Sequence, residues 1–322
     1  MDVKIANTII RNLPKDQTLF EYYNDRHAVL LLQRILHEPT PIAALKRTRF
    51  AKLLDCSGVK EVVAAKGDGI LCPQDLLYVP QIDPAQFVLT LGLWGARKRD
   101  RFWHQTSRPG VNLVLQLNFD NAHDRAYERL VQPACESPLN YEDHPVCKKG
   151  RTTLAWARID VDLISGEALI EEIQSDWVRR AQRMQNYAYR LQNERGVQTA
   201  SELDLWRGDT RIGPLPQFIE YAELVLAPRA QYWQQAMLSA AIWFVTEELG
   251  LERIWYHSHQ TGAKLKKITQ KQPPHSLYSQ LPKQFCFEKR CDGPDFIVAR
   301  SQKRLKKRVE HGKERFWHLT LE

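Results

Sequence analysis

The strongest constraint on the fold is a pair of strand patterns that lie close together in the middle of the chain. Residues 153–162 (TLAWARIDVD) and 168–175 (ALIEEIQS) read as strands separated by a short link that contains Ser165-Gly166, and residues 111–119 (VNLVLQLNF) alternate apolar and polar side chains. Alternation of this kind is typical of half-buried strands, and a short link with glycine favours a tight hairpin. Residues 86–93 and 111–119 also read as strands. We therefore expect an antiparallel region in a sheet.

A long helix pattern followed directly by a strand indicates a crossover connection. Residues 232–249 carry apolar side chains at three-to-four spacing, Gly250 ends the pattern, and residues 253–257 read as a strand. A second long helix is expected to run from Trp177 to Arg195. The sequence therefore predicts the α/β class, with a mixed sheet that contains an antiparallel hairpin and a crossover helix.

Proline and glycine divide the chain into two predicted units. Residues 1–84 contain several short helix patterns and are expected to form a small helical module. Residues 85–322 are expected to form an α/β catalytic domain, in which the polar, proline-containing stretches 120–150 and 196–220 read as loop insertions. The short helix patterns are residues 26–36, 42–54 and 57–65.

Composition excludes several classes of protein. Of 322 residues, 43% are hydrophobic and 26% are charged, which argues against a disordered chain. No apolar run approaches 18 residues, so we expect no transmembrane helix and no membrane partner. The first residues lack the apolar core of a secretory signal, and no two of the six cysteines form a Cys-x-x-Cys pair. We therefore expect a cytoplasmic protein with reduced cysteines.

The chain is basic, with 46 Lys and Arg against 38 Asp and Glu and a formal net charge of +8. The excess gathers in three runs, at residues 46–52, 97–101 and 300–315. Aromatic residues interleave with the last two, which favours nucleic acid or another polyanion as partner, although each run alone is compatible with a solvated face. The anion-binding candidates in the last run are Arg304, Lys307 and Arg308.

The most unusual stretch is Glu171-Glu172-Ile173-Gln174-Ser175-Asp176-Trp177, because strands normally avoid this many acids. Strict alternation places Glu172, Gln174 and Asp176 on one face. If Ser165-Gly166 is a two-residue turn, Glu172 lies opposite the apolar Ile159. Such a neighbour would raise the pKa of Glu172 and suit it to general-base catalysis. The alternative is that Glu172 pairs with an arginine elsewhere in the fold.

The run LIEEIQSDW resembles a signature in large polyvalent proteins of phages and mobile elements. The resemblance covers roughly residues 150–290 and departs after Trp177, where Val178-Arg179 replaces the His-Gln of that pattern. The resemblance implies which residues belong to a functional site, but it does not imply which reaction they catalyse. The other matching elements are Trp233, Gly250, residues 254–262 (IWYHSHQTG) and residues 277–283 (LYSQLPK).

The order of elements from residue 153 onward is similar to that of the Gcn5-related N-acetyltransferases. The segment Leu277-Tyr278-x-x-Leu281 followed by Phe285-x-Phe287-Glu288 looks like part of that family's second half. The resemblance implies that Glu172 is a general base and that Tyr278 protonates a leaving thiolate. It also makes an acyl-coenzyme A a candidate donor. The glycine-rich pyrophosphate loop of the family is missing, however, and Asp176 would repel a pyrophosphate, so another acyl donor fits better.

Two other functions remain open at this stage. Asp162 followed by Glu172-Ile173-Gln174 resembles the hairpin of metal-dependent nucleases, with Gln174 in place of a lysine, and there Asp162 and Glu172 would hold Mg²⁺. With a two-residue turn, Asp162 would lie on the face opposite to Glu172, which argues against a shared ion. A three-residue loop would instead place both carboxylates on the same face. The other possibility is a non-enzymatic nucleic-acid-binding module, in which Glu172 plays no part.

The end of the strand at 253–257 provides further site candidates, because strand ends in α/β sheets collect ligands and catalytic groups. His257 is a catalytic candidate, and the turn after it resembles an anion cradle; exposed loop histidines are the alternative. A zinc site among the later cysteines and His144 would match no familiar finger spacing. We expect Trp177 and Trp233 to pack in the core. The cradle candidates are His259, Thr261, Gly262 and Lys264, and the cysteine group is Cys135, Cys147, Cys286 and Cys291.

Together these patterns predict a transferase that acts on an anionic or nucleic-acid-linked substrate. The residues expected to converge on one cleft are Glu172, Gln174, Asp176, His257 and Tyr278.

Overall fold

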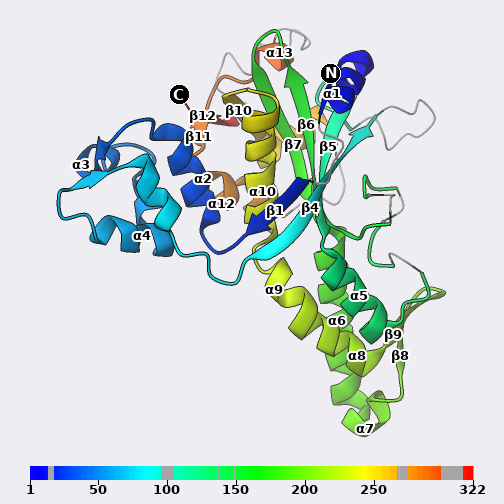
Figure 1. The fold of residues 1–322 in the computed structure, drawn as a ribbon. Coiled ribbons are helices and arrows are strands. Elements are labelled where there is room, and N and C mark those ends of the chain that lie inside the picture. The colour runs from blue at the N-terminus through cyan, green and yellow to red at the C-terminus, as the bar shows by residue number, and fades with distance from the viewer. Residues whose placement is uncertain are drawn as a thin grey trace.

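The fold is built around one large mixed sheet (Figure 1). The computed structural model describes residues 1–13, 18–95, 105–135, 138–141, 143–147, 150–266, 268, 274–298 and 315–321. Within these residues, eight strands form the sheet in the order β1-β4-β5-β6-β7-β10-β12-β11. The predicted mixed α/β class is therefore confirmed.

The strands of this sheet are β1 (Thr18–Tyr22), β4 (Ala85–Trp94), β5 (Asn112–Phe119), β6 (Thr153–Asp162), β7 (Glu167–Gln174), β10 (Arg253–His257), β11 (Glu288–Arg290) and β12 (Phe316–Thr320). Two small sheets are formed by β2 (Thr40–Pro41) with β3 (Ile70–Leu71), and by β8 (Asp204–Arg207) with β9 (Thr210–Pro214). The α-helices are α1 (Val3–Asn12), α2 (Arg26–Ile35), α3 (Ile42–Leu45), α4 (Ser57–Ala64), α5 (Asn121–Val131), α6 (Asp176–Arg195), α7 (Val197–Ala200), α8 (Leu215–Glu220), α9 (Ala227–Ala230), α10 (Trp233–Trp243), α11 (His259–Leu265), α12 (Gln280–Gln284) and α13 (Asp295–Val298). Shorter 3₁₀ segments are η1 (Ala51–Asp55), η2 (Pro73–Tyr78) and η6 (His275–Tyr278), and π-helical segments are η4 (Tyr221–Leu226) and η5 (Phe244–Glu248).

The strand directions divide the sheet into an antiparallel part and a crossover. Strands β1, β4, β5, β6 and β7 pair antiparallel in turn. Strand β10 pairs parallel with β7, and β12 and β11 then follow antiparallel. Parallel neighbours need a long connection, and here the chain passes through α6 to α10 between β7 and β10.

The two faces of the sheet differ in chemistry. On β6, Ala155, Ala157 and Ile159 belong to the main apolar core, against which α6 and α10 pack. The alternate residues Arg158 and Asp160 are also fully buried but lie on the other face. Because buried charges are costly unless they are paired, this second face must provide ionic and hydrogen-bond partners.

The β6–β7 hairpin has a different register from the predicted one. The strands are joined by a four-residue turn, 163–166, rather than by Ser165-Gly166 alone. A register shift at Glu171 then places Glu172 opposite Arg158, not opposite Ile159. The prediction of an apolar partner for Glu172 was therefore wrong, because it assumed strict alternation: the four-residue turn alone would have paired Glu172 with the apolar Ala157, and the register shift moves it to Arg158.

The first 84 residues contain the expected helices but also contribute to the large sheet. Strand β1 pairs with β4 at one edge. Helices α2 to α4 form a lobe beside the sheet, and the broad helix pattern at 42–54 resolves into α3 and η1 (Figure 1). One apolar cluster runs from Met1 to Leu321 and so includes residues of both predicted units. The division at residue 84 stays a prediction.

Both segments predicted to be loops contain regular structure. Helix α5 occupies residues 121–131, where Asp120 caps its first turn by accepting a hydrogen bond from the His123 N–H. The segment 196–220 holds α7, β8, β9 and α8. These elements are short and polar on the outside, so their hydropathy pattern resembled that of loops. The segment 285–288 also reads as a strand in the sequence, but the strand found there, β11, begins only at Glu288.

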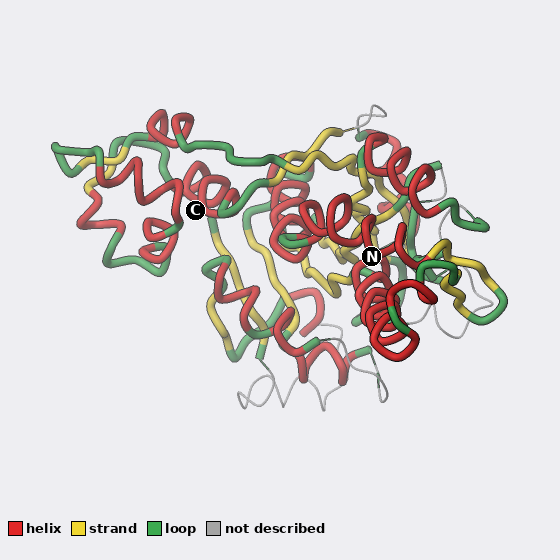
Figure 2. Tube along the Cα trace, turned by 90° about the horizontal axis from the view of Figure 1, so that it is seen from below, coloured by secondary structure: helices red, strands yellow, loops and turns green. Residues whose placement is uncertain are grey.

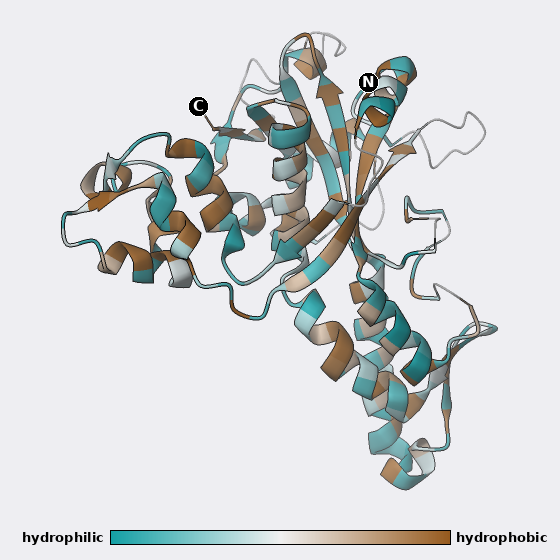
Figure 3. Cartoon of the chain, viewed as in Figure 1, coloured by the Kyte–Doolittle hydropathy of each residue, from teal (hydrophilic) through white to brown (hydrophobic). Residues whose placement is uncertain are grey.

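Two lobes project from the sheet in different directions, one built by α2 to α4 and the other by α5 to α9 (Figure 1). The first of them also stands apart from the large sheet in the view from below (Figure 2). Hydrophobic residues (brown) are frequent along the strands, whereas hydrophilic residues (teal) make up much of the second lobe (Figure 3). Within the described residues, no helix has the length and apolar character needed to cross a membrane.

Candidate functional site

The candidate site lies where β7 and β10 stop pairing. Their parallel ladder ends at Ile170 and Tyr256, and β7 continues to Gln174 while β10 ends one residue later at His257. The register shift in β7 lies just beyond this point. A β-bulge turns two consecutive side chains toward one face of a sheet, and both Glu171 and Glu172 contact buried polar groups there.

Glu171 is the centre of a buried hydrogen-bond network. Its Oε1 accepts a bond from the Ser107 N–H at 2.9 Å, and its Oε2 accepts one from Ser107 Oγ at 2.6 Å. The same Oε2 lies 3.1 Å from His257 Nε2, and Ser107 Oγ lies 2.7 Å from that nitrogen. Both Glu171 and His257 are fully buried. His257 was predicted as a site residue from its place at a strand end, whereas strict alternation would have put Glu171 on the face opposite to Glu172.

These distances fix the hydrogen-bonding pattern of the His257 ring. Because the Glu171 carboxylate only accepts, Nε2 must carry the proton that it donates to this cluster. The other nitrogen, Nδ1, is buried and finds no hydrogen-bond partner among the described residues. Its lone pair is therefore available to a proton. A Ser-His-Asp relay has a different order, since its carboxylate and its serine bind opposite ring nitrogens.

The charges of this pair follow from burial and from their neighbours. Burial lowers the pKa of the His257 imidazole by more than the Glu171 carboxylate raises it, so the ring is neutral at pH 7. Burial acts to raise the pKa of Glu171, but the bond to His257 and the nearby cations lower it to about 2. The pair therefore consists of a neutral base held by an ionised carboxylate.

Glu172 is held in an ion pair rather than in an apolar pocket. It binds the Arg158 guanidinium, and Lys266 Nζ lies 3.6 Å from its Oε2. Burial acts to raise its pKa, but Lys266 and Arg158 lower it to about 2. The prediction of a raised pKa was wrong, and the alternative of an arginine partner is confirmed. An ionised group with so low a pKa is a weak proton acceptor.

Gln174 and Asp176 belong to a second cluster, at the start of α6. Asp176 is buried and accepts bonds from Gln174 Nε2 at 2.7 Å and from Arg179 Nη2 at 2.9 Å. The His144 Nδ1 lies 2.6 Å from its other oxygen. Ser175 Oγ caps the helix by accepting from the Val178 N–H. Asp176 thus already supplies a negative charge at the helix N-terminus, as the helix dipole favours.

The two carboxylates proposed for a nuclease do not converge. Asp162 lies 3.2 Å from Arg108 Nη1, and Glu172 pairs with Arg158. Since Glu172 lies opposite Arg158, four residues before Asp162 on β6, the backbone positions of the two residues are about 13 Å apart along the strand at about 3.3 Å per residue, and each carboxylate is engaged by a different arginine. They therefore do not form a shared Mg²⁺ site. The earlier question of whether the turn length places Asp162 and Glu172 on the same face no longer decides the matter.

Two buried tyrosines of the main core have hydroxyls without a hydrogen-bond partner among the described residues. The hydroxyls of Tyr256 and Tyr278 are buried and make no hydrogen bond with the described part of the chain. Their rings are 5.4 Å apart. Burial, and then the charge of Glu172, raises the pKa of both hydroxyls. Buried polar groups normally have partners, so these hydroxyls are candidates to bind a polar ligand.

The predicted anion cradle is largely engaged in structural contacts. Ser258 caps α11 by accepting a bond from the Thr261 N–H, and Thr261 Oγ1 donates to the Arg315 carbonyl. Gly262 packs on His257, where an added Cβ would lie 3.1 Å from the His257 Cβ. His259 is half-buried, with its ring 6.0 Å from that of Tyr278, and Lys264 is exposed. The other three anion-binding candidates, Arg304, Lys307 and Arg308, lie outside the described residues.

Four residues of the hydrogen-bond and ion-pair network around Glu171 and Glu172 were not predicted from the sequence. They lie in three separate segments, which only the fold brings together, and serine, lysine and arginine at these places carry no motif. The break in alternation between Ile170 and Ile173, which both face the main core, was the signal that could have revealed the bulge. The missed residues are Ser107, Arg158, Lys266 and, as a member of this face, Glu171.

Trp177 is fully buried and belongs to the main core, as predicted, and Trp233 packs partly buried against that core. The zinc group considered for His144 and the later cysteines is not found among the described residues, where the ligand atoms that lie close together belong to other side chains and His144 Nδ1 lies 2.6 Å from Asp176. Cys135 and Cys291 are exposed.

Comparisons with protein-family models, with curated proteins and with solved structures find no match to this chain. The resemblance to polyvalent phage proteins therefore stays a prediction.

Acid is expected to destabilise the fold through His257. Its folded-state pKa is lowered, so below pH 6.5, the ordinary pKa of histidine, the unfolded chain takes up a proton that the folded chain does not. Stability therefore falls as pH falls through this range. In His257→Gln this contribution disappears, and the pH slope of the unfolding free energy should decrease by up to about 1.4 kcal/mol per pH unit.

Urea unfolding of both proteins at pH 7, 6 and 5 measures this slope. The exposed His37 provides the matched control, because His37→Gln removes an imidazole without touching the network. An equal slope in His257→Gln and in the unmodified chain would contradict a buried neutral His257.

Proposed function

We propose that this chain is a group transferase with a core similar to that of the Gcn5-related N-acetyltransferases. The observation that carries the proposal is the neutral His257 at the end of β10, which is bound through Nε2 to Glu171 and whose Nδ1 has no hydrogen-bond partner among the described residues. Ligands of open α/β sheets bind at the carboxyl ends of parallel strands that a crossover connects. Strands β7 and β10 end in this way.

The strand order supports this comparison with the acetyltransferases. The antiparallel β6–β7 hairpin, the helical crossover and the parallel β10 follow the element order on which the resemblance rests. Strand β12 then lies between β10 and β11. This agreement concerns topology, and the reaction is argued separately from the side chains.

Each residue has a proposed role. His257 Nδ1 accepts the proton of the attacking group, and Glu171 positions the ring through Nε2. Tyr278, whose pKa is raised by burial, carries its proton at pH 7 and donates it to the leaving group. Glu172 is proposed to act by its charge, which holds Arg158 and Lys266 in place, and not as the general base.

The reaction that suits these groups is acyl transfer from a thioester. A nucleophilic N–H or O–H group of the acceptor loses its proton to His257 Nδ1 as its N–C or O–C bond forms. The carbon–sulfur bond then breaks, and the leaving thiolate takes its proton from Tyr278. The proton on His257 returns to Tyr278 through solvent, so charge and atoms balance over one cycle.

The donor is proposed to be a thioester without a pyrophosphate at the start of α6. That position already holds the buried Asp176, which would repel phosphate at close range. The formal net charge of +8, with exposed Lys46, Arg47 and Lys52, favours an anionic or nucleic-acid-linked acceptor. A short acyl pantetheine and acetyl-coenzyme A are therefore the two donors to compare.

Thiol release and product mass test this function. The full chain is incubated with S-acetyl-pantetheine or acetyl-coenzyme A and with a mixed-sequence RNA or DNA oligonucleotide, and acetylated product is detected by mass spectrometry. We expect transfer from acetyl-pantetheine and a loss of about 10²–10⁴-fold in His257→Gln, the range for removal of a general base. Tyr278→Phe should slow thiolate release, whereas the exposed-site variants His37→Gln and Tyr78→Phe should retain full activity.

Equal activity of His257→Gln and the unmodified chain, or no transfer from either donor to either acceptor, would overturn the proposal. In that case two further measurements identify the alternative. Cleavage of plasmid DNA with Mn²⁺ would indicate a nuclease. Salt-dependent binding of the oligonucleotide that is unchanged in His257→Gln would indicate a binding module.

A further inference from the structure

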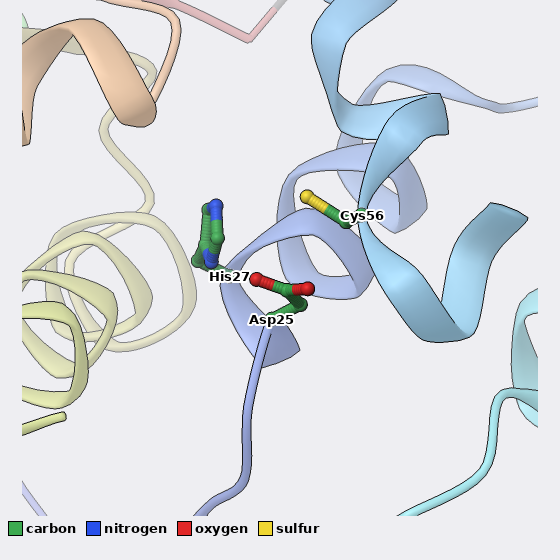
Figure 4. A group of neighbouring side chains, drawn as sticks. All are labelled: Asp25, His27 and Cys56. Carbon is green, nitrogen blue, oxygen red and sulfur yellow. The ribbon is translucent and has the colours of Figure 1, made fainter. Parts of the chain in front are cut away.

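Three side chains with metal-ligating atoms meet in the lobe formed by α2 to α4, away from the β7–β10 site. Asp25 precedes α2, His27 lies in the first turn of α2, and Cys56 precedes α4. One ligand atom from each residue lies within 4.8 Å of the other two. Figure 4 shows the carboxylate, the imidazole and the thiol pointing toward one another.

His27 is a buried base without a partner. The side chain is 1% exposed, and its Nδ1 makes no hydrogen bond within the described residues. One face of the ring packs on Phe285, with 4.7 Å between ring centroids. Packing on Phe285 explains why the ring is buried. It does not explain why Nδ1 is buried without a hydrogen-bond partner, which is energetically costly.

The other two side chains are held in place by their own contacts. Asp25 Oδ2 accepts bonds from the Ser57 N–H at 3.0 Å and from Ser57 Oγ at 3.2 Å. These bonds leave Oδ1 for another ligand and connect the start of α2 to the start of α4. Cys56 is a half-buried free thiol, whose Sγ lies 3.9 Å from the Lys52 carbonyl oxygen.

We infer that Asp25, His27 and Cys56 form a zinc-binding site. Carboxylate oxygen, imidazole nitrogen and thiolate sulfur are the ligands of Zn²⁺ in proteins, with bonds of about 2.0–2.3 Å. Atoms bound to one tetrahedral ion of this size lie about 3.3–3.6 Å apart, so side-chain rotations that bring the three ligand atoms about 1 Å closer together would close the site. The softer sulfur and nitrogen ligands disfavour Mg²⁺ and Ca²⁺. Binding releases the thiol proton of Cys56 to solvent.

Three protein ligands leave the fourth tetrahedral position open. Zinc sites of this kind hold water or an external ligand there, whereas closed structural sites have four protein ligands. Since the ligands come from the starts of α2 and α4, the ion would also fasten the two helices together. Binding to the folded chain alone should therefore raise its midpoint of thermal unfolding.

Cobalt substitution tests the inference on the full chain. After treatment with a chelator, the protein is titrated with Co²⁺ under reducing conditions, and the thiolate-to-cobalt charge-transfer absorption and the visible bands of tetrahedral cobalt are recorded. Zn²⁺ is then added in competition. We expect saturation at one equivalent of cobalt, with displacement by zinc and an increase in the thermal midpoint.

Variants assign the ligands. Cys56→Ser keeps the size of the side chain but removes the thiolate, and it should abolish the charge-transfer band. Asp25→Asn should weaken cobalt binding by at least tenfold. The exposed cysteine variants Cys135→Ser and Cys291→Ser are the matched controls and should retain the band. The inference is wrong if the unmodified chain shows no band with excess cobalt, or if Cys56→Ser keeps the full band.

Discussion

Arg158→Met is expected to destabilise the protein by about 3 kcal/mol, at the lower end of the range for breaking a buried ion pair. Arg158 is fully buried, binds the Glu172 carboxylate and donates from Nη1 to the Gln105 carbonyl at 2.7 Å. Methionine fills much of the same space but leaves Glu172 with one cation fewer. Lys266, at 3.6 Å from Glu172 Oε2, keeps part of the compensation, which is why a value near 5 kcal/mol is not expected.

The pH dependence of this loss identifies its cause. The pKa of Glu172 is lowered to about 2 in the folded chain, below its ordinary value of about 4.3. A depressed folded-state pKa stabilises the protein above the ordinary pKa, and that stabilisation is lost as pH falls toward 2. Without Arg158 the folded-state pKa rises and the carboxyl protonates earlier. The difference between Arg158→Met and the unmodified chain should therefore be largest above pH 5 and should shrink below pH 4.

Urea unfolding at pH 7 and pH 3.5 measures both effects. Arg290→Met is the matched control, because Arg290 forms a comparable pair with Asp292 at the exposed surface, where such pairs contribute less than about 1 kcal/mol. Adding Glu172→Gln to Arg158→Met removes the unpaired charge and should restore part of the stability. Equal losses in Arg158→Met and Arg290→Met, or a loss that does not vary with pH, would contradict the buried pair.

This ion pair also shows what the sequence alone could predict. The apolar face of the hairpin was readable, because Ala155, Ala157 and Ile159 alternate with other residues and all lie in the core. The partner of Glu172 was not readable, because it depends on the length of the turn and on a one-residue bulge. A shift of one residue moves a side chain to the other face of a strand. The sequence therefore located the acidic strand but misassigned the environment of its charges.

The network around His257 was less accessible still. His257 is recognisable in the sequence because it ends a strand pattern. Ser107, which contacts His257, and Lys266, which contacts Glu171, come from segments that are distant in the sequence and meet only in the folded chain. Lys266 donates to the Glu171 carbonyl at 2.9 Å, at a place where the bulge has disrupted the ladder. Periodicity describes local structure, whereas these contacts follow from the packing of α11 and of the segment near Ser107 on the sheet.

Trp177→Ala is expected to cost about 3–5 kcal/mol, the range for truncating a large buried aromatic side chain. Trp177 is fully buried in the first turn of α6, and its ring meets that of Tyr127 at a centroid distance of 5.1 Å. Its Nε1 donates to the Tyr221 hydroxyl at 2.7 Å. Alanine would therefore leave a cavity between α5, α6 and η4 and remove a buried hydrogen bond.

Trp177→Phe separates these two contributions. Phenylalanine fills most of the space but cannot donate a hydrogen bond, and Tyr221 keeps its contact with His123 Nε2 at 3.0 Å. We therefore expect a smaller loss, about 1–2 kcal/mol. The exposed Trp206 gives the matched control, since Trp206→Ala should change the unfolding free energy by less than about 0.5 kcal/mol. If Trp177→Ala cost no more than Trp206→Ala, the aromatic cluster would not hold α6. The first turn of α6, which carries Asp176 next to Trp177, would then not hold a fixed position beside the end of β7.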